Sequence, residues 1–313
     1  MNSILVKKFK KKFLSRDCFY WLSYYVVEYL GLAKYLSDKH YIQLRYRCAF
    51  SKSINLKTPV TFNEKINWLK LYDHNPLYTS LVDKAEVKEW VSNRIGKQYI
   101  IPTLREWNRI EDIEWGSLPA QFVIKWNHDS GSVVICRSKS SFDIEKAKQV
   151  LYDGEKNNGY THAREWPYKN VKKKLILEPY IEDKETQELR DYKFFCFNGV
   201  VRALFVATDR QNRVEPFFNF FDINYKPLGI KQGHPVSQTI PLKPKGFEKM
   251  KEIASKLSEG FPHVRVDLYE ANGEILFGEL TFYHFGGLVP FNPDSIDYEW
   301  GEYIDLSLVS KNS

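Results

Sequence analysis

The stretch RVDLYEANGEILFGELTF, residues 265–282, alternates between polar and apolar side chains in the way that two β-strands joined by a short turn do. A sheet with one buried face explains the apolar set of the stretch together with the valine directly before it, namely Val264, Val266, Leu268, Leu276, Leu280 and Phe282. Arg265 and Asp267 then share the opposite face. The stretch therefore predicts a hairpin with a charged face, and the turn decides whether Glu279 joins that face.

Two turns are compatible with the amino-acid sequence of this hairpin. A two-residue Asn272-Gly273 turn pairs Glu279 with Val266, whereas a three-residue loop over 271–273 sets it opposite Arg265 with Asp267 diagonal to both. The apolar pattern favours the three-residue loop. Two carboxylates so close repel each other, and Mg²⁺ is a common remedy. The alternative is a pair of solvated charges on an exposed sheet face.

Composition restricts the class of protein. The 313 residues are 43% hydrophobic and 27% charged, which is ordinary for a soluble chain and excludes disordered and fibrous classes. The chain is rich in aromatic residues, with 21 Phe and 20 Tyr, which suit either a core or stacking on bases and sugars. Its four cysteines are scattered without ligand spacing, so we expect neither a zinc site nor a disulfide framework, and a reducing cytoplasm as the setting.

Residues 1–55 are expected to form a helical N-terminal arm that is basic and then aromatic. Residues 1–16 hold five lysines and an arginine without an acid, and their apolar residues recur at near-helical spacing. Such an arm can bind the anionic inner face of a membrane or pack on the main body. Because the positive charge is concentrated here and not along an aromatic stripe, nucleic acid is not expected as a partner.

The remaining sequence alternates helices and strands in two successive sheet regions. A capping box of Thr61 and Glu64 opens a helix over 61–72, and Gly96 ends a second over 82–96. Further helices are expected at 142–156 and 246–260, strands at 121–126, 132–137, 173–181 and 216–222, and a hairpin at 189–210. This order predicts an α+β fold with one lobe over 56–175 and another over 176–313.

Three places outside the opening hairpin could carry chemistry. Lys125 ends a strand before a polar loop with Gly131, whose amides could cup phosphate oxygens, although such loops also simply turn hairpins. Glu178 ends an apolar strand just before Pro179. Asp191 and Lys193 share one side of a strand, either as a functional pair or as a cross-strand ion pair.

These pieces occur in an order that resembles the ATP-grasp superfamily, and within it the TupA-like branch found with bacterial surface-polysaccharide genes. The resemblance covers roughly residues 55 to 306 and is carried by TFNEKINWLKLYD, DKAEVKEWVSNRIGKQYIIP, FVIKWNHDSG, EWPYKN, LRDYKFFCFNG and RVDLYEANGEILFGELTF. It implies two α+β lobes with ATP between them and Mg²⁺ as a second cofactor.

The resemblance also implies roles for single residues. Arg265 and Lys193 match catalytic positions, and Asp267 and Glu279 match the metal-binding acids. The positions implied for nucleotide binding are Lys84, Lys125, His128, Ser130, Gly131, Ser132, Glu178, Tyr180, Ile181 and Asp191. One departure concerns Thr281, which stands where the superfamily usually has asparagine and is a poorer metal ligand.

By this resemblance the chain is expected to be an ATP-dependent carboxylate-amine ligase that works through an acyl phosphate. The branch context suggests a uronic acid or other carboxylated sugar as one partner and an amino acid or similar amine as the other, in capsule or O-antigen synthesis. The alternatives are a nucleotide-sugar glycosyltransferase, although the sequence has no D-x-D signature, and a membrane-associated binding protein with weak activity.

Overall fold

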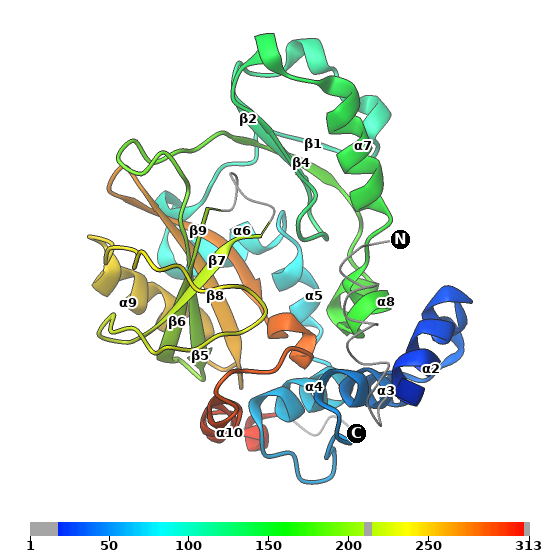
Figure 1. Ribbon diagram of the computed structural model, residues 1–313. Helices are drawn as coiled ribbons and strands as arrows, with labels where there is room; N and C mark the ends of the chain where they lie inside the picture. Colours follow the sequence, from blue (N-terminus) through cyan, green and yellow to red (C-terminus); the bar gives the residue numbers. More distant parts are fainter. Residues whose placement is uncertain (1–17, 210–214, 310–313) are drawn as a thin grey trace.

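Two antiparallel sheets organise the computed structural model, which describes residues 18–209 and 215–309 (Figure 1). The smaller sheet has the order β1-β4-β2-β3, with β1 Arg105–Trp107, β2 Phe122–Trp126, β3 Val133–Cys136 and β4 Leu175–Pro179. The larger has the order β7-β6-β5-β8-β9, with β5 Asp191–Phe197, β6 Val200–Thr208, β7 Phe217–Asp222, β8 Val264–Ala271 and β9 Glu274–Thr281. The α+β fold is confirmed.

The opening hairpin, β8 and β9, keeps its predicted charged face but not its predicted turn. Ala271 pairs with Glu274, so Asn272 and Gly273 form a two-residue turn with positive φ angles of 54° and 81°. The prediction of a three-residue loop was wrong. A β-bulge shifts the register instead: Leu268 pairs with Phe277 and Asp267 pairs with Glu279, which leaves Gly278 as the extra residue.

The bulge corrects the apolar assignment as well. Leu276 pairs with Tyr269, whereas Phe277 pairs with Leu268, so Phe277 takes the place in the apolar layer that the sequence pattern gave to Leu276. Beyond the bulge Val266 pairs with Leu280, as the pattern predicts. Glu279 therefore shares the face of Arg265 and Asp267, because the extra residue restores the alternation that the short turn would have reversed.

Helices cover the larger sheet and share its core. Helix α9, Phe247–Ser258, buries Met250, Ile253 and Leu257 in the same cluster as the sheet residues. Three earlier helices also contribute to this cluster: α4 Phe62–Tyr72, α5 Leu77–Val82 and α6 Val87–Ile95. The capping box that opens α4 is confirmed, since the Glu64 amide donates to Thr61 Oγ1 at 3.2 Å and the Thr61 amide to Glu64 Oε2 at 3.3 Å.

The predicted helix over 82–96 starts later than expected. Asp83 accepts backbone hydrogen bonds from Ala85 at 2.8 Å and Glu86 at 3.2 Å, and this turn delays α6 until Val87. The helix ends before Gly96, as predicted. Lys84 consequently lies in a turn between two helices.

The smaller sheet has a core of its own, covered by α7, Ile144–Glu155. Leu151 of this helix packs with Trp126 of β2, whose indole donates to the Leu151 carbonyl at 2.7 Å. Short helices α8, Gly159–Ala163, and η6, Trp166–Lys169, lead from α7 to β4. The upper lobe in Figure 1 is thus β1 to β4 with α7.

Packing divides the chain differently from the predicted lobe boundaries. Helices α4 to α6, which we expected in the lobe over 56–175, belong to the core of the larger sheet. Strand β4 crosses the predicted boundary and pairs with β1 and β2 in the smaller sheet. The chain therefore passes from the large core to the small one and back.

The N-terminal region is helical over its described part, with α2 Cys18–Tyr29, η1 Leu32–Tyr35 and α3 Asp38–Phe50. Buried Ile42 and Tyr46 attach α3 to the body, where Leu71 of α4 packs against them. The basic segment 1–16, for which we predicted a membrane role, lies outside the described residues. Of the helices within 18–209 and 215–309, none has both the length and the apolar character that crossing a bilayer requires. A last helix, α10 Ser295–Glu302, packs on α4.

Candidate functional site

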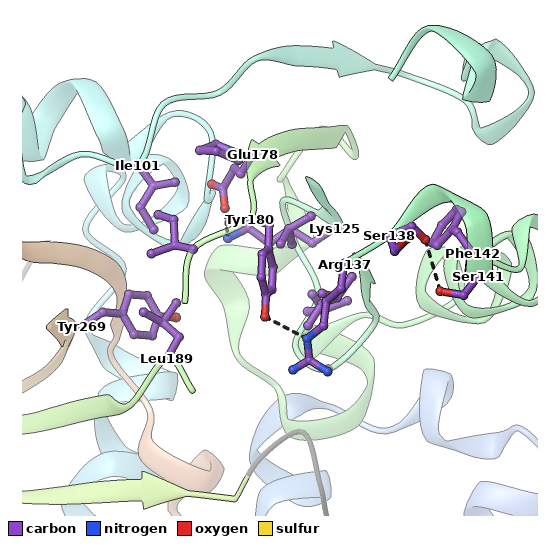
Figure 2. A pocket seen from close by; sticks show the side chains of 16 residues that line it. Ile101, Lys125, Arg137, Ser138, Ser141, Phe142, Glu178, Tyr180, Leu189 and Tyr269 are labelled. Atoms are coloured by element: carbon purple, nitrogen blue, oxygen red, sulfur yellow. Dashed lines mark hydrogen bonds and ion pairs between the residues drawn. The ribbon is translucent and has the colours of Figure 1, made fainter. Parts of the chain in front are cut away.

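A cavity of about 660 Å³ opens between the two sheets, within the usual size range for small-molecule sites (Figure 2). Lys125 and Glu178 from the smaller sheet lie on one wall, and Tyr269 from β8 with Ile101 and Leu189 lies on another. The remaining lining comes from strands β2, β3 and β4 and the loops that follow them, namely Val123, Gly131, Val133, Ile135, Arg137, Ser138, Ser141, Phe142, Pro179, Tyr180 and Ile181. A flat apolar ligand bearing a charged group fits this mixture.

Glu178 is held between two lysines at the inner end of the cavity. Its Oε2 lies 2.6 Å from Lys125 Nζ, and its Oε1 lies 2.6 Å from Lys88 Nζ. Burial opposes ionisation of this carboxyl, but Lys125 and Lys88 outweigh it and lower its pKa. Lys84 lines the adjoining small cavity together with these two lysines and Glu178, so three lysines and one carboxylate border this corner, which is cationic and suits an anion.

The loop after β2 is fixed at its base and exposed at its tip. Asn127 Nδ2 donates to Asp83 Oδ2 at 2.7 Å, and the Ser132 amide donates to Asp129 Oδ2 at 3.2 Å. Gly131 has a φ of 105°, and a Cβ there would meet open space, so only backbone borders the cavity at this point. Such a loop can present amide groups to phosphate oxygens.

Lys84 joins this loop to the charged face of the hairpin. Its ammonium donates to the Asp129 carbonyl at 2.7 Å and lies 3.5 Å from Glu279 Oε2. The turn that Asp83 caps holds the lysine in this position, and the Lys84 amide donates to the Asn127 carbonyl at 3.1 Å. The cavity and the hairpin face therefore form one continuous site.

The hairpin face carries a dense ion-pair network. Arg265 donates from Nε to Asp267 Oδ1 at 2.7 Å and from Nη2 to Asp267 Oδ2 at 2.8 Å. Lys193 pairs with Asp191 at 2.7 Å and also with Asp267. Burial opposes the charge on Arg265, but Asp267 and Glu279 outweigh it and raise its pKa, so the guanidinium stays charged.

Glu279 is the least tightly held member of this network. Its carboxylate lies 3.5 Å from both Arg265 Nη2 and Lys84 Nζ, and the side chain is 28% exposed. Burial opposes its ionisation, but Lys84, Lys193 and Arg265 outweigh burial and keep its pKa below the usual range. Its oxygens are therefore charged and can accept a further cation.

The predicted magnesium ligands differ in how well they fit the ion. Both oxygens of Asp267 are already engaged by Arg265 and Lys193, and Thr281 Oγ1 accepts from Arg265 Nη2 at 3.0 Å. No cluster of three or more His, Cys, Asp or Glu suited to a metal occurs in the described ranges. Mg²⁺ usually needs only one or two carboxylates when phosphates complete its shell, and Glu279 offers one.

Sequence reasoning missed a buried relay behind Arg265. Arg265 Nη1 donates to His284 Nδ1 at 2.7 Å, and His284 Nε2 lies 2.9 Å from Gln232 Oε1. Burial and the charge of Arg265 hold the pKa of His284 well below its usual value, so the ring is neutral and carries its proton on Nε2. No spacing in the sequence indicates these contacts, because Gln232 comes from a distant loop.

A second missed feature lies in the EWPYK motif. Buried Lys70 donates to the carbonyls of Ala163 at 2.8 Å and Gly286 at 2.7 Å, and this ties the segment before Glu165 to the segment after β9. Burial lowers the pKa of Lys70 to about 7 and raises that of Glu165 to about 7. Lys88 was also missed, although it stands four residues after Lys84 in the quoted DKAEVKEWVSNRIGKQYIIP stretch.

The predicted nucleotide residues divide into three groups. Lys125, Gly131, Glu178, Tyr180 and Ile181 line the cavity. Lys84 lies at its inner end, and Asp191 lies with Lys193 in the hairpin network.

The other three lie in the loop after β2. Ser130 is exposed, and Ser132 packs close to Gly154 of α7. His128 is buried beneath the loop, with its Nε2 3.1 Å from the Asn157 carbonyl and its pKa lowered by burial to about 4. His128 therefore supports the loop as a neutral ring.

Two antiparallel sheets that enclose a cationic cavity, with a charged hairpin at its end, define a two-lobed α+β protein with a site for an anionic ligand. Residues 64–305 match the family described as TupA-like ATPgrasp, so the chain belongs to that family, and the predicted membership is confirmed. Among curated proteins, no match was found.

Several solved structures are similar to this chain at low identity. D-alanine–D-alanine ligase from Bacillus anthracis complexed with ATP has 14% identity and a TM-score of 0.37, covering 64% of this chain and 55% of that one. The enzyme of that name from Helicobacter pylori has 13% identity and a TM-score of 0.43, covering 80% and 69%. N5-carboxyaminoimidazole ribonucleotide synthetase from Thermus thermophilus has 11% identity and a TM-score of 0.36, covering 77% and 52%. The chain thus spans little more than half the length of the Bacillus anthracis enzyme.

Proposed function

We propose that this protein is an ATP-dependent ligase that joins a carboxylate to an amine. The observation that carries the proposal is the convergence of Lys84, Lys88 and Lys125 at the inner end of the cavity, where Lys84 also lies 3.5 Å from the carboxylate of Glu279. Family membership supports ATP as the ligand, and the apolar outer cavity suits a base while the cationic corner suits phosphates.

In the proposed reaction, a carboxylate oxygen attacks the γ-phosphorus and the bond to the bridging oxygen of ADP breaks. The amine nitrogen then attacks the acyl carbon, phosphate leaves, and an amide remains. Phosphoryl transfer needs mainly positioning and compensation of charge. Lys84 and Lys125 would compensate the phosphates, and the amides of the loop around Gly131 would cover them.

Glu279 is the residue that would hold Mg²⁺ together with the phosphates, and Asp267 could join only by giving up its contacts with Arg265 and Lys193. When bound, the ion would neutralise charge on the phosphate oxygens. Arg265 and Lys193 would keep the hairpin face in register, since their donors are already directed at Asp267 and, for Lys193, Asp191.

The identity of the two substrates and the cellular setting are proposed from the family. The carboxylate would belong to a sugar such as a uronic acid and the amine to an amino acid, as in the synthesis of capsule or O-antigen. The protein would work in the cytoplasm, where ATP is available, and its basic N-terminal segment supports peripheral contact with the inner face of the membrane.

Hydroxylamine offers a test that does not need the natural amine, because it converts an acyl phosphate into a hydroxamate. The protein with ATP and Mg²⁺ would be screened against carboxylated sugars, and ADP and hydroxamate would be measured together. We expect both products with the same carboxylate, and neither from Glu279→Gln. ATP binding with no hydroxamate from any carboxylate, or sugar transfer from a nucleotide sugar without ATP, would overturn the proposal.

A further inference from the structure

The outer face of α2 carries an apolar surface that continues into η1. Leu22, Tyr25, Val26 and Tyr29 recur at helical spacing, and their exposed fractions are 46%, 38%, 40% and 77%. Tyr25 and Tyr29 stack with ring centroids 6.0 Å apart, which confirms that they share one face. We call the whole surface the outer stripe; its residues are Leu22, Tyr25, Val26, Tyr29, Leu30, Leu32 and Tyr35.

Polar contacts on the inner face fix the rotation of α2. Arg45 Nη1 donates to the Tyr24 hydroxyl at 2.7 Å, and the Tyr41 hydroxyl donates to Glu28 Oε1 at 2.5 Å. Both partners, Arg45 and Tyr41, belong to α3, which the body holds through its own small core. The stripe is therefore directed away from α3, and Figure 1 shows α2 at the edge of the molecule, away from both sheets.

The positively charged residues near the outer stripe in the sequence indicate which kind of partner binds it. The sequence directly before α2 has Lys7, Lys8, Lys10, Lys11, Lys12 and Arg16, and its first acid is Asp17. Between the stripe residues Leu32 and Tyr35, the ammonium of Lys34 lies 5.0 Å from the centre of the Tyr35 ring. Tyrosine and leucine that follow a dense group of cations in the sequence suit the interface of an anionic bilayer, whereas the cores of protein interfaces are depleted of lysine.

We propose that the outer stripe is a docking face for an anionic lipid bilayer. Its leucine and tyrosine side chains enter the headgroup region, and Lys34, which lies between Leu32 and Tyr35, binds a lipid phosphate. This inference deepens the proposed membrane contact by naming the residues that enter the bilayer. It does not depend on the ligase chemistry.

Vesicle sedimentation of the full-length protein tests the proposal. One set of vesicles holds equal parts of phosphatidylglycerol and phosphatidylcholine, and the other holds phosphatidylcholine alone. The stripe variant combines Leu22→Ser, Tyr29→Ser and Leu30→Ser. Its matched control combines Val236→Ser, Ile240→Ser and Leu242→Ser, which are also exposed apolar residues but lie far from α2 in the sequence. Because all six are exposed, both variants should melt like the wild type.

We expect the wild type and the matched control to bind the anionic vesicles and the stripe variant to bind at least about tenfold more weakly, since several apolar groups no longer leave water. Deletion of residues 1–16 should weaken binding and remove its dependence on salt. Unchanged binding by the stripe variant would overturn the proposal. So would a stripe variant that turns a dimer into a monomer in light scattering while binding vesicles as before, because the stripe would then be a contact between copies of the chain. None of these readouts uses ATP, so failure here leaves the proposed ligase function untouched.

Discussion

Lys125 is the single residue whose role in nucleotide binding is easiest to isolate. Its ammonium lies 2.6 Å from Glu178 Oε2 and borders the cavity. Replacement by alanine leaves Glu178 paired with Lys88, so the fold should survive. We expect Lys125→Ala to weaken ATP binding by roughly ten- to a hundredfold, the usual cost of a lost charged hydrogen bond.

Titration calorimetry measures this change directly. Lys146→Ala is the matched control, because Lys146 is an exposed lysine of α7 outside the cavity lining. An affinity of Lys125→Ala equal to that of the wild type would show that the cavity binds something other than phosphate at this corner.

Glu165 should make stability depend on pH. Burial raises its pKa from 4.5 to about 7, so between these values the folded protein holds a proton that the unfolded chain has lost. The free energy of unfolding of the wild type therefore falls as the pH rises through this window. In Glu165→Gln this loss is absent, and the variant should gain stability relative to the wild type between about pH 5 and about pH 7.

Urea unfolding of both proteins at the two pH values gives the comparison. The difference between variant and wild type is the informative quantity, because groups that Glu165 does not perturb affect both proteins equally. Lys70 adds to this difference in the same direction, since loss of Glu165 lowers the pKa of Lys70 further. A difference that is the same at both pH values would mean that Glu165 titrates at its ordinary pKa.

At the residue scale, the sequence could predict residues that stand next to one another in a motif. Lys125, Gly131 and Glu178 were predicted from strand ends and a polar loop, and all three line the cavity. Gln232 and Lys70 were not, because each meets its partners only through the packing of distant segments. A buried polar residue in a helix or loop has no periodic signature.

The β8–β9 hairpin depends on its bulge at Gly278. A Cβ at this position would lie 3.0 Å from the Asp267 carbonyl oxygen and 3.0 Å from the Tyr269 ring, so the backbone of the pair would have to move. Gly278→Ala should cost about 1–3 kcal/mol of unfolding free energy, as overpacking usually does. It should also displace Glu279, which follows directly in the chain, and reduce ADP formation.

Chemical denaturation and the hydroxamate assay check these two expectations separately. Gly116→Ala is a suitable control, since a Cβ at Gly116 meets no atom within 4 Å. A Gly278→Ala protein with wild-type stability and turnover would show that the bulge tolerates a side chain and does not position the acid.

At the element scale, the sequence predicted the types of helix and strand better than their registers. The strands and the charged face of the hairpin follow from the alternation of polar and apolar residues. This face was predicted from a three-residue loop, whereas in the structure a bulge at Gly278 places Glu279 on it. Glycine inside a strand is itself a bulge signal, and Gly278 could have been recognised as one. The late start of α6 has the same kind of cause, a local Asp83 turn that competes with the helix.

For the whole molecule, the order of strands shows why two lobes could be predicted but not their boundaries. Distant strands meet in both sheets, since β4 pairs with β1 and β2 in the smaller sheet and β8 pairs with β5 in the larger. Helices α4 to α6 precede the small sheet in the chain but pack on the large one. Apolar periodicity marks a buried face without indicating which core receives it.

Binding of ATP should couple the two sheets, because the cavity takes its walls from both. Lys125 and Glu178 come from the smaller sheet and Tyr269 from the larger, and Lys84 connects the loop after β2 with Glu279. A ligand that fills this space stabilises only the arrangement in which both walls are present. At ATP concentrations about a hundred times the dissociation constant, global unfolding should cost about 2.7 kcal/mol more, which slows exchange of the most protected amides about a hundredfold.

Hydrogen exchange with and without ATP and Mg²⁺ measures this coupling peptide by peptide. Protection should increase in the loop over 127–132 and in β8 and β9 together, although these segments belong to different lobes. Lys125→Ala at the same ATP concentration should lose most of the added protection in both, whereas Lys146→Ala should keep it. Protection confined to the smaller sheet would mean that ATP binds to one lobe alone, and the hairpin acids would then have no part in holding its phosphates.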